Sequence, residues 1–284
     1  MSALFRLTFM KISIVDIGSN AVKYKIFNSE NFELLEYYRE PLRLGRDVFS
    51  NNKLSEVTIN ALVNLLESYT KIFIERNVKE SYFIATSAVR DSSNSDYLTE
   101  KLKEIGINLK IITGKQEASL LIDFNENIQD SAVIDIGGGS VEVCINKASK
   151  MHYESFQLGA VRLLSLDQNC RNEVMREFSS WLEKFKPVST TFGLGGNLRA
   201  IMQANNHTGV IEVAKLKNLV TTYNQLEEKV LLDIYEIPKD RIDIVPIAAE
   251  IYLLFLASID AKTIENSFWS ISDGLIKKVV KGEL

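Results

Sequence analysis

The sequence predicts an α/β protein in which two domains of similar fold face each other across a cleft. One segment, an apolar strand followed by a glycine-containing turn and a second strand, occurs twice about 120 residues apart. Predicted strands and helices alternate along the rest of the chain, which is typical of α/β layers. The length of 284 residues suits about two domains. We expect an N-terminal domain over residues 1–127 and a C-terminal domain over residues 128–284.

The more informative copy of the repeated segment is Ala132–Ile145, AVIDIGGGSVEVCI. Its first apolar run ends at Asp135, three glycines and Ser140 follow, and the second run carries Glu142. Consecutive glycines allow positive φ and leave no Cβ to keep a ligand from the backbone amides. Such amides can form an anion-binding nest. Taken alone, the segment is equally compatible with a plain glycine-rich hairpin and a solvated Glu142.

The other copy aligns with it without gaps, Ile14–Val22 onto Val133–Val141. Asp16 then matches Asp135, Gly18 matches Gly137, and Lys23 stands where the second copy has Glu142. Because of that last difference, the two turns cannot be equivalent. The two carboxylates beside the second turn suit a divalent metal or a positioned water, and we expect the first turn to hold phosphate only. Two phosphate-holding turns on facing domains suit an extended phosphate ligand.

The elements between the copies follow from apolar spacing. A stripe of apolar residues at helical intervals predicts a helix over Leu54–Arg76, and Gly106 is a suitable stop for a helix over Asp96–Ile105. Polar residues Asn125–Asp130 are the best candidate for a linker. The remaining predicted elements here are strands at 11–15, 21–27, 32–38, 81–86 and 109–112, and a helix at 115–124.

The C-terminal half has the same alternating character. A third glycine-rich turn, Gly193–Asn197, ends a predicted strand and enters a helix. Pro246 lies near the first turn of a long apolar helix over Ile244–Ala257, where proline is tolerated. We further expect strands at 153–156, 189–193 and 268–271, and helices from 159 and at 173–184, 215–232 and 273–280.

Composition excludes several classes of protein. A net charge of −4 and a pI of about 5.5 argue against broad electrostatic binding of nucleic acid, so a polyanion needs a local basic site. Two histidines argue against a His-rich zinc site. Cys144 lies in an apolar strand pattern, which favours a buried thiol and a reducing cytoplasm over a disulfide. No apolar run approaches the ~20 residues of a membrane span, so we expect no membrane partner.

The N-terminal residues MSALFRLTFMK make a poor signal peptide, because the apolar part is short and contains an arginine. The residues directly after Met10 have the pattern of a β-strand. A translation start at Met10, with residues 1–9 as an extension or a misassigned start, is therefore a hypothesis. Intact mass of the native protein would decide it.

The glycine turns do not match the common nucleotide motifs. None has the GxxxxGK[ST] pattern of a P-loop, and none is a GxGxxG followed by an acidic residue about 20 positions later. Ordinary P-loop NTPases and dinucleotide-binding folds are therefore disfavoured.

Seven blocks, in order from about Lys11 to about Val280, resemble the exopolyphosphatase / guanosine pentaphosphate phosphohydrolase (Ppx/GppA) phosphatase family. They are VDIGSN, IATSAVRDSSN, ITGKQEASLLI, VIDIGGGSVEV, FGLGGN, DRIDIVPIAAEIYL and SISDGLI. The resemblance implies the actin-like, sugar-kinase-like (ribonuclease H-like) duplicated fold, with two domains around a cleft. That implication agrees with the internal repeat, which is independent of it.

The same resemblance implies a cytoplasmic, Mg²⁺-dependent hydrolase that releases terminal phosphate from inorganic polyphosphate, guanosine pentaphosphate or both. Glu117 of the GKQEA block would be the base that activates water, and Asp135 and Glu142 would hold Mg²⁺. Arg43, which precedes a helix, is a further phosphate candidate from its position. The full set of expected phosphate-binding residues is Gly18, Ser19, Asn20, Arg43, Arg90, Gly137, Gly138, Gly139 and Ser140.

Two alternatives stay open. One is a small-molecule kinase of the same superfamily, although such kinases usually carry DxGxT-like turns where this chain has DIGSN and DIGGGS. The other is a regulator that binds polyphosphate or an alarmone without turnover. The chain stops near residue 284, without the C-terminal helical extension of longer members, so we expect a short polyphosphate track. A homodimer is among the oligomeric states left open.

Overall fold

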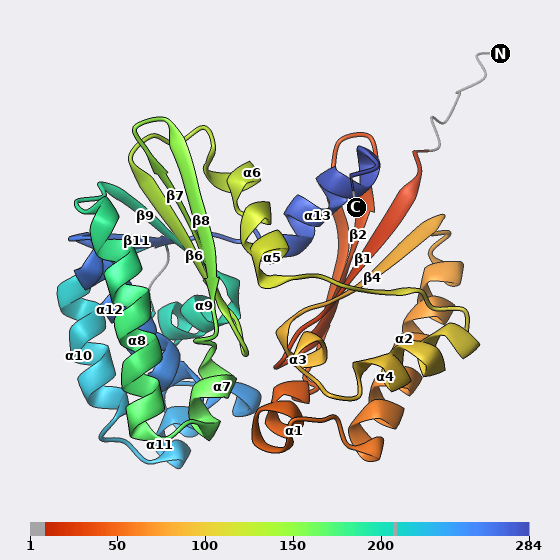
Figure 1. Cartoon of the computed structure of the whole chain (residues 1–284), viewed down its shortest axis with the longest axis horizontal. Coiled ribbons are helices and arrows are strands. Elements are labelled where there is room, and N and C mark those ends of the chain that lie inside the picture. The colour runs from red at the N-terminus through yellow and green to blue at the C-terminus, as the bar shows by residue number, and fades with distance from the viewer. Residues whose placement is uncertain (1–8, 207–208, 284) are drawn as a thin grey trace.

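The computed structural model describes residues 9–206 and 209–283. Two β-sheets lie side by side, each with helices packed against it (Figure 1). We call the elements packed on the five-stranded sheet the first lobe and those packed on the six-stranded sheet the second lobe. Residues 1–8, most of the suggested N-terminal extension, lie outside the described residues.

The two sheets repeat one topology. In each, three antiparallel strands are followed by a strand that pairs in parallel with the first of them and by a further strand that pairs in parallel with that one. The second sheet adds one antiparallel edge strand. The order in the first sheet is β3 (Leu34–Glu40), β2 (Val22–Asn28), β1 (Lys11–Ile17), β4 (Glu80–Ala85), β5 (Leu109–Ile111); in the second it is β10 (Val210–Glu212), β11 (Thr263–Asn266), β9 (Thr190–Leu194), β6 (Ser131–Ile136), β7 (Val141–Lys147), β8 (Lys150–Phe156).

Helices fill the connections between strands, as expected for an α/β fold. Several begin with local capping: Ser55 accepts a hydrogen bond from the Thr58 amide at the start of α2, and Thr113 forms a capping box with Gln116 at the start of α5. The helices are α1 (Leu44–Asn51), α2 (Glu56–Glu75), α3 (Ser87–Arg90), α4 (Ser95–Glu104), α5 (Gly114–Leu120), α6 (Ile122–Asn125), α7 (Ala160–Ser165), α8 (Gln168–Leu182), α9 (Gly195–Ala204), α10 (Val213–Tyr223), α11 (Glu228–Asp233), α12 (Val245–Ser258) and α13 (Ile271–Val280), with short 3₁₀ turns at Glu183–Phe185 and Lys239–Arg241.

The internal repeat is confirmed residue by residue. In the first lobe Asp16 lies opposite Lys23 across the β1–β2 ladder, and in the second lobe Asp135 lies opposite Glu142 across β6–β7. The same aligned positions therefore meet in both sheets. Together with the shared strand order, this register shows a duplicated fold.

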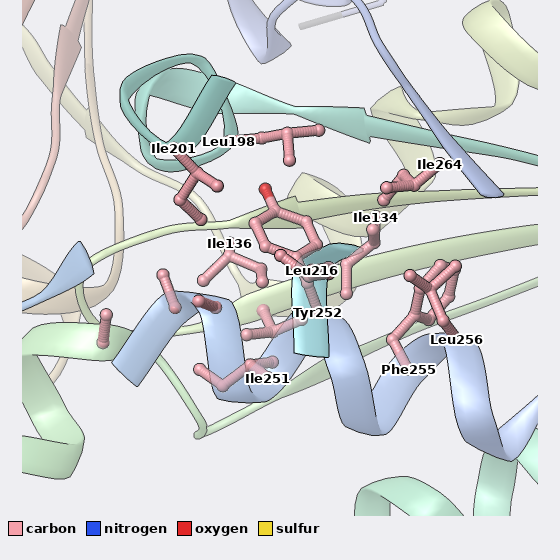
Figure 2. Packing of buried hydrophobic residues seen from close by; sticks show 14 of the residues in the cluster. Ile134, Ile136, Leu198, Ile201, Leu216, Ile251, Tyr252, Phe255, Leu256 and Ile264 are labelled. Carbon is pink, nitrogen blue, oxygen red and sulfur yellow. The ribbon is translucent and has the colours of Figure 1, made fainter. Parts of the chain in front are cut away.

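The central strands are apolar on both faces because helices cover both sides of each sheet. In the second lobe, Tyr252 of α12 inserts among Ile134, Ile136 and Leu198 (Figure 2). Its hydroxyl donates to the Leu194 carbonyl at 3.0 Å, so the buried polar group is satisfied. This packing holds the ends of β6 and β9, which carry two of the glycine turns.

Two predicted elements are wrong, and a third, the helix expected at 115–124, is divided into α5 and α6 at Leu121. The strand expected at 268–271 is a loop that leads into α13, because Ser270 and Asp273 form a capping box that starts a helix; the observed strand is β11, at Thr263–Asn266. The helix expected at 215–232 is two helices, since α10 ends at Tyr223 and α11 begins only at Glu228.

The chain crosses between the lobes more than once. Helix α13 returns to the first lobe, where Leu275 and Ile276 pack against Ile12 and Ile14 of β1. At the predicted linker, the completely buried Asn125 donates to the Cys144 carbonyl at 3.1 Å, which ties it to the second sheet. A division of the chain at 127/128 stays a prediction.

Two predictions from composition can be compared directly with the structure. Cys144 is a buried free thiol, as expected, and Cys170 is an exposed free thiol. Within residues 9–206 and 209–283, no helix has the length and apolarity needed to cross a membrane.

We predict that Leu275→Ala lowers the free energy of unfolding by about 2–5 kcal/mol, because it opens a cavity between α13 and β1. Val280→Ala, at an exposed position of the same helix, is the control and should change stability by less than about 1 kcal/mol. Urea denaturation followed by circular dichroism measures both. Equal, small effects would mean that α13 contributes little to the first lobe.

Candidate active site

A cavity of about 410 Å³ lies between the lobes, where the β1–β2 and β6–β7 turns face each other. Ligands of open α/β sheets bind at this edge, beyond the carboxyl ends of the strands. The cavity collects most of the predicted site residues, and those that line it are Gly18, Ser19, Asn20, Glu117, Asp135, Gly137, Gly138, Ser140 and Glu142.

Both turns are closed in the same way. The Gly18 amide donates to the Ala21 carbonyl at 3.1 Å, and the Gly137 amide donates to the Ser140 carbonyl at 3.0 Å. The side chains of Ser19 and Asn20 then border the cavity from the first lobe, and that of Ser140 borders it from the second. The turns can therefore offer amide and hydroxyl donors to one anion from two sides.

Gly139 lies in the contact between the lobes and, unlike Gly137 and Gly138, does not line the cavity. A Cβ at this position would lie 2.5 Å from the Phe49 ring, 2.4 Å from Ser87 Oγ and 2.8 Å from Ser19 Oγ. Glycine is therefore required for the two lobes to touch here. Gly139 packs in this contact and is absent from the cavity lining, so its expected phosphate contact stays a prediction.

The charged pair across the strands is attractive in the first hairpin and repulsive in the second. Lys23 Nζ lies 2.9 Å from Asp16 Oδ2, so the first hairpin contains a neutralised pair. In the second, Asp135 and Glu142 place two carboxylates directly opposite each other, an arrangement that is destabilising by itself. Burial and the nearby Asp135 raise the pKa of Glu142 to about 7, against hydrogen bonds from Ser140 and Ser155. Burial also raises the pKa of Asp135.

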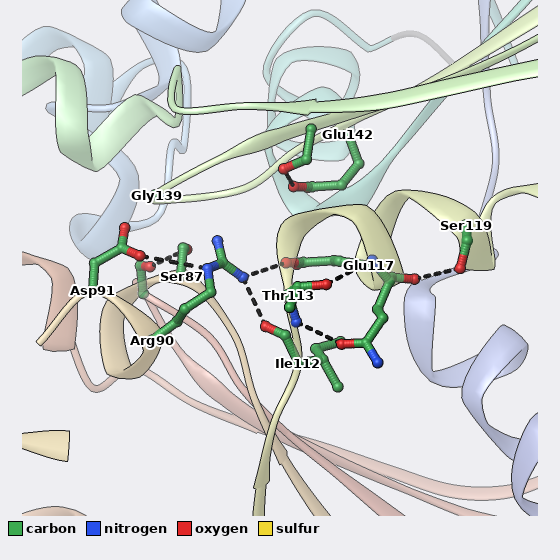
Figure 3. Close-up of polar contacts among 12 residues, drawn as sticks. Ser87, Arg90, Asp91, Ile112, Thr113, Glu117, Ser119, Gly139 and Glu142 are labelled. Atoms are coloured by element: carbon green, nitrogen blue, oxygen red, sulfur yellow. Dashed lines mark hydrogen bonds and ion pairs between the residues drawn. The ribbon is translucent and has the colours of Figure 1, made fainter. Parts of the chain in front are cut away.

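Glu117 faces this acidic pair from the first turn of α5. Its side chain is buried, and Oε2 lies 3.3 Å from Nη1 of Arg90 (Figure 3). Burial and the charge of Glu142 raise the pKa of Glu117 well above its ordinary value, although Arg90 opposes the change. The local fold explains its position, because the capping box at Thr113 fixes the start of α5.

Arg90 and Arg43 lie outside the cavity lining. Arg90 stands behind Glu117 and also donates to the Ile112 carbonyl at 3.0 Å. Its buried Nη2 has no hydrogen-bond partner within the part of the chain that the structure describes. Arg43 lines a separate hollow and pairs with Asp243 at 2.9 Å. The expected phosphate contact of Arg43 stays a prediction without support from its position.

Several cavity residues have no role in the sequence-based prediction. The most informative are cationic: Lys25, paired with Asp273 at 2.5 Å, together with Arg199 and Arg241 of the second lobe. Arg241 Nη1 donates to Asn197 Oδ1 at 2.6 Å, so it is tied to the third glycine turn. The blocks DRIDIVPIAAEIYL and SISDGLI contained the available signal, because Arg241 and Ser270–Ser272 lie in them.

The described residues include no group of three or more His, Cys, Asp or Glu side chains arranged to hold a metal. A site built on protein ligands alone, such as structural zinc, is therefore not indicated there. The pair Asp135 and Glu142 matches a different pattern. Mg²⁺ usually takes one or two carboxylates and keeps several waters.

We predict that Glu142→Gln stabilises the protein at pH 8 in the presence of a chelator, by an amount on the order of 2–3 kcal/mol. The folded-state pKa of Glu142 is raised, so ionisation costs stability as pH rises from about 4.5 to about 7. The variant imitates the protonated carboxyl, and its advantage should vanish at pH 5. Denaturation at both pH values measures this.

Glu177→Gln, at an exposed position of α8, is the matched control and should show no such pH-dependent gain. A Glu142 variant that is less stable than the parent at pH 8 would contradict the opposed-carboxylate interpretation.

The comparisons with known proteins agree on one family. The model of the Ppx/GppA phosphatase family matches residues 24–283. The bifunctional 3-dehydroquinate synthase/phosphatase of Fusobacterium nucleatum is 28% identical over 269 residues, covering 84% of this chain and 40% of that protein. The guanosine-5'-triphosphate,3'-diphosphate pyrophosphatase of Aliivibrio fischeri is 25% identical, covering 92% and 57%. Exopolyphosphatase 1 of Mycobacterium tuberculosis is 29% identical, covering 54% and 48%. The chain thus spans about half the length of these relatives.

Two solved structures align over nearly their full length. The Ppx/GppA family member of Aquifex aeolicus has a TM-score of 0.75 and 24% identity, covering 97% of this chain and 99% of its own. An exopolyphosphatase from Cytophaga hutchinsonii has a TM-score of 0.84 and 21% identity, covering 96% and 98%. These likenesses show the fold, which is the actin-like, sugar-kinase-like one. With the family match across residues 24–283, they establish that this chain belongs to the Ppx/GppA phosphatase family.

Proposed function

We propose that this protein hydrolyses terminal phosphoanhydride bonds of inorganic polyphosphate, guanosine pentaphosphate or both. One observation carries the proposal: a buried carboxylate, an opposed carboxylate pair and two glycine turns line the same cavity between the lobes. Phosphoryl transfer needs positioning and charge neutralisation more than covalent chemistry, and these groups supply both. Relatives named for exopolyphosphatase and guanosine pyrophosphatase activity support the substrate class.

Glu117 is proposed as the general base. Its raised pKa makes it a stronger proton acceptor than an ordinary glutamate, provided that it is ionised at the working pH. It would take the proton of the attacking water as the new P–O bond forms and the anhydride oxygen leaves. Arg90, at 3.3 Å, favours the ionised form and holds the carboxylate in place.

Asp135 and Glu142 are proposed to hold Mg²⁺. The donor set fits, since both are oxygen ligands, they stand opposite each other, and no ion pair to either is found among the described residues. A bound Mg²⁺ would supply charge neutralisation to phosphate oxygens. The same cation would relieve the repulsion between the two carboxylates.

The turns are proposed to bind the phosphate groups through the backbone amide of Gly138 and the hydroxyl groups of Ser19 and Ser140. Gly18 and Gly137, whose amides close the two turns, border the same space without a Cβ. Asn20 borders the same space, although its amide also donates to Asp240 across the cleft at 3.2 Å. Four cationic side chains also line the cavity. Lys23 and Lys25 are paired with Asp16 and Asp273, which leaves Arg199 and Arg241 as the lining cations proposed to contact a polyanion.

A cytoplasmic location is part of the proposal, because Cys144 and Cys170 are both free thiols in the structure. The oligomeric state, including a homodimer, is not part of it.

We predict that Glu117→Gln lowers kcat for phosphate release from both polyphosphate and guanosine pentaphosphate by about 10²- to 10⁴-fold. The wild-type rate should also fall as pH drops through the raised pKa of Glu117, at a pH above the range of an ordinary carboxylate. A phosphate-release assay with Mg²⁺ measures both. Undiminished turnover in the variant would overturn the mechanism.

Two further measurements, of substrate binding and of ATP-dependent phosphorylation, separate the alternatives. Tight binding of either substrate without turnover by the wild type would favour a regulator. ATP-dependent phosphorylation of a small acceptor would favour a kinase.

We predict that Mg²⁺ raises the melting temperature of the wild type and has a much smaller effect on Asp135→Asn, because that variant lacks one of the two proposed ligands. Asp123→Asn, a change on α6 at a residue outside the cavity lining, is the control and should respond to Mg²⁺ like the wild type. Equal Mg²⁺ responses in the two variants would remove Asp135 from the metal site.

A further inference from the structure

One arginine of the second lobe reaches across the cleft to the first. Arg162 of α7 donates from Nε to the Gly139 carbonyl at 2.6 Å and from Nη2 to a carboxylate oxygen of Asp91. Its guanidinium also lies over the Phe49 ring of α1, 4.2 Å from the centroid. Three contacts therefore hold this one group, and two of them are to residues of the first lobe.

Asp91 connects this contact to the candidate active site. It follows α3 directly, and its Oδ1 lies 3.4 Å from Nε of Arg90 while Oδ2 accepts from Arg162. Arg90 in turn pairs through Nη1 with Glu117 at 3.3 Å. Figure 3 shows Arg90 between Asp91 and Glu117. The four charged side chains form one unbroken series from α7 of the second lobe to the carboxylate on α5.

The series fixes the orientation of Arg90. Asp91 contacts the guanidinium at Nε, and Glu117 with the Ile112 carbonyl holds Nη1. The remaining nitrogen, Nη2, is buried and has no partner among the described residues. A planar guanidinium held on two edges has its third edge aimed in a fixed direction. The group left over is a donor suited to a phosphate oxygen.

We propose that Asp91 and Arg162 are positioning residues that keep Arg90 aligned with Glu117 only while the lobes are closed. If the lobes separate, Arg162 no longer contacts Asp91. The Asp91 carboxylate is then no longer fixed, and it no longer fixes the orientation of Arg90. Closure of the cleft is thereby coupled to assembly of the reaction centre. This inference depends on the proposed function for its kinetic consequence, but its structural part can be measured without turnover.

The kinetic arm compares Asp91→Asn and Arg162→Gln with the wild type in the phosphate-release assay. Each should lower kcat by about 10- to 100-fold, the cost of a small misalignment, with KM changed by less than about threefold. Asp91→Glu, which keeps the carboxylate, should recover part of the loss. Arg46→Gln breaks another ion pair between the lobes, with Asp243 at 3.0 Å, and should leave kcat unchanged.

A double-mutant cycle shows whether Asp91 acts through Arg90. In an Arg90→Lys background, Asp91→Asn should cause no further loss of kcat, because the group it aligns is already gone. Losses that multiply would mean that Asp91 acts independently of Arg90, and the proposal would be overturned.

The structural arm uses the full chain labelled with ¹⁵N-arginine. The Nε–H signal of Arg90, assigned by its absence in Arg90→Lys, should be protected from exchange in the wild type and lose protection in Asp91→Asn and Arg162→Gln. Retained protection in both variants would overturn the positioning role whatever the activity. A wild type that hydrolyses neither substrate would instead refute the proposed function, and the exchange result would still decide the alignment of Arg90.

Discussion

The arrangement of the candidate active site depends on the repulsion between two carboxylates in one β-ladder. Asp135 and Glu142 face each other across β6–β7, where the equivalent pair in the first lobe is the attractive Asp16 and Lys23. Like charges in this register cost stability unless a cation lies between them. The duplicated fold therefore offers two turns that are closed in the same way, and Glu142 in place of a lysine makes the second ladder repulsive where the first is attractive.

Much of this could be predicted from the sequence because the information is local. The strand–turn–strand repeat, the glycine turns and Glu117 in a capped first turn depend on neighbouring residues, and the structure places them as expected around one cavity. A local signal also explains one of the wrong predictions. A strand was expected at 268–271, but Ser270 and Asp273 form a capping box there that starts a helix.

The rest could not be predicted because it depends on contacts between distant segments. Arg43 has a side chain that suits a phosphate ligand. It pairs instead with Asp243, 200 residues later in the sequence, and lines a different hollow. Arg241 was not singled out within its block. It lies in the 3₁₀ turn Lys239–Arg241, and its hydrogen bond to Asn197 of α9, a residue distant in sequence, ties it to the cavity. Charged side chains without a periodic pattern acquire their roles from tertiary structure.

Because α13 returns to the first lobe, the chain connects the two lobes at two places. The polypeptide leaves the first lobe near Ile112 and re-enters it near Ile271, and Gly274 of α13 packs directly against Leu120 of α5. Any movement of one lobe relative to the other would have to bend the chain at these two touching connections, α5 and α13. Such a movement could not bring the lobes closer at Gly139, where no room is left for a Cβ beside Phe49 and Ser87.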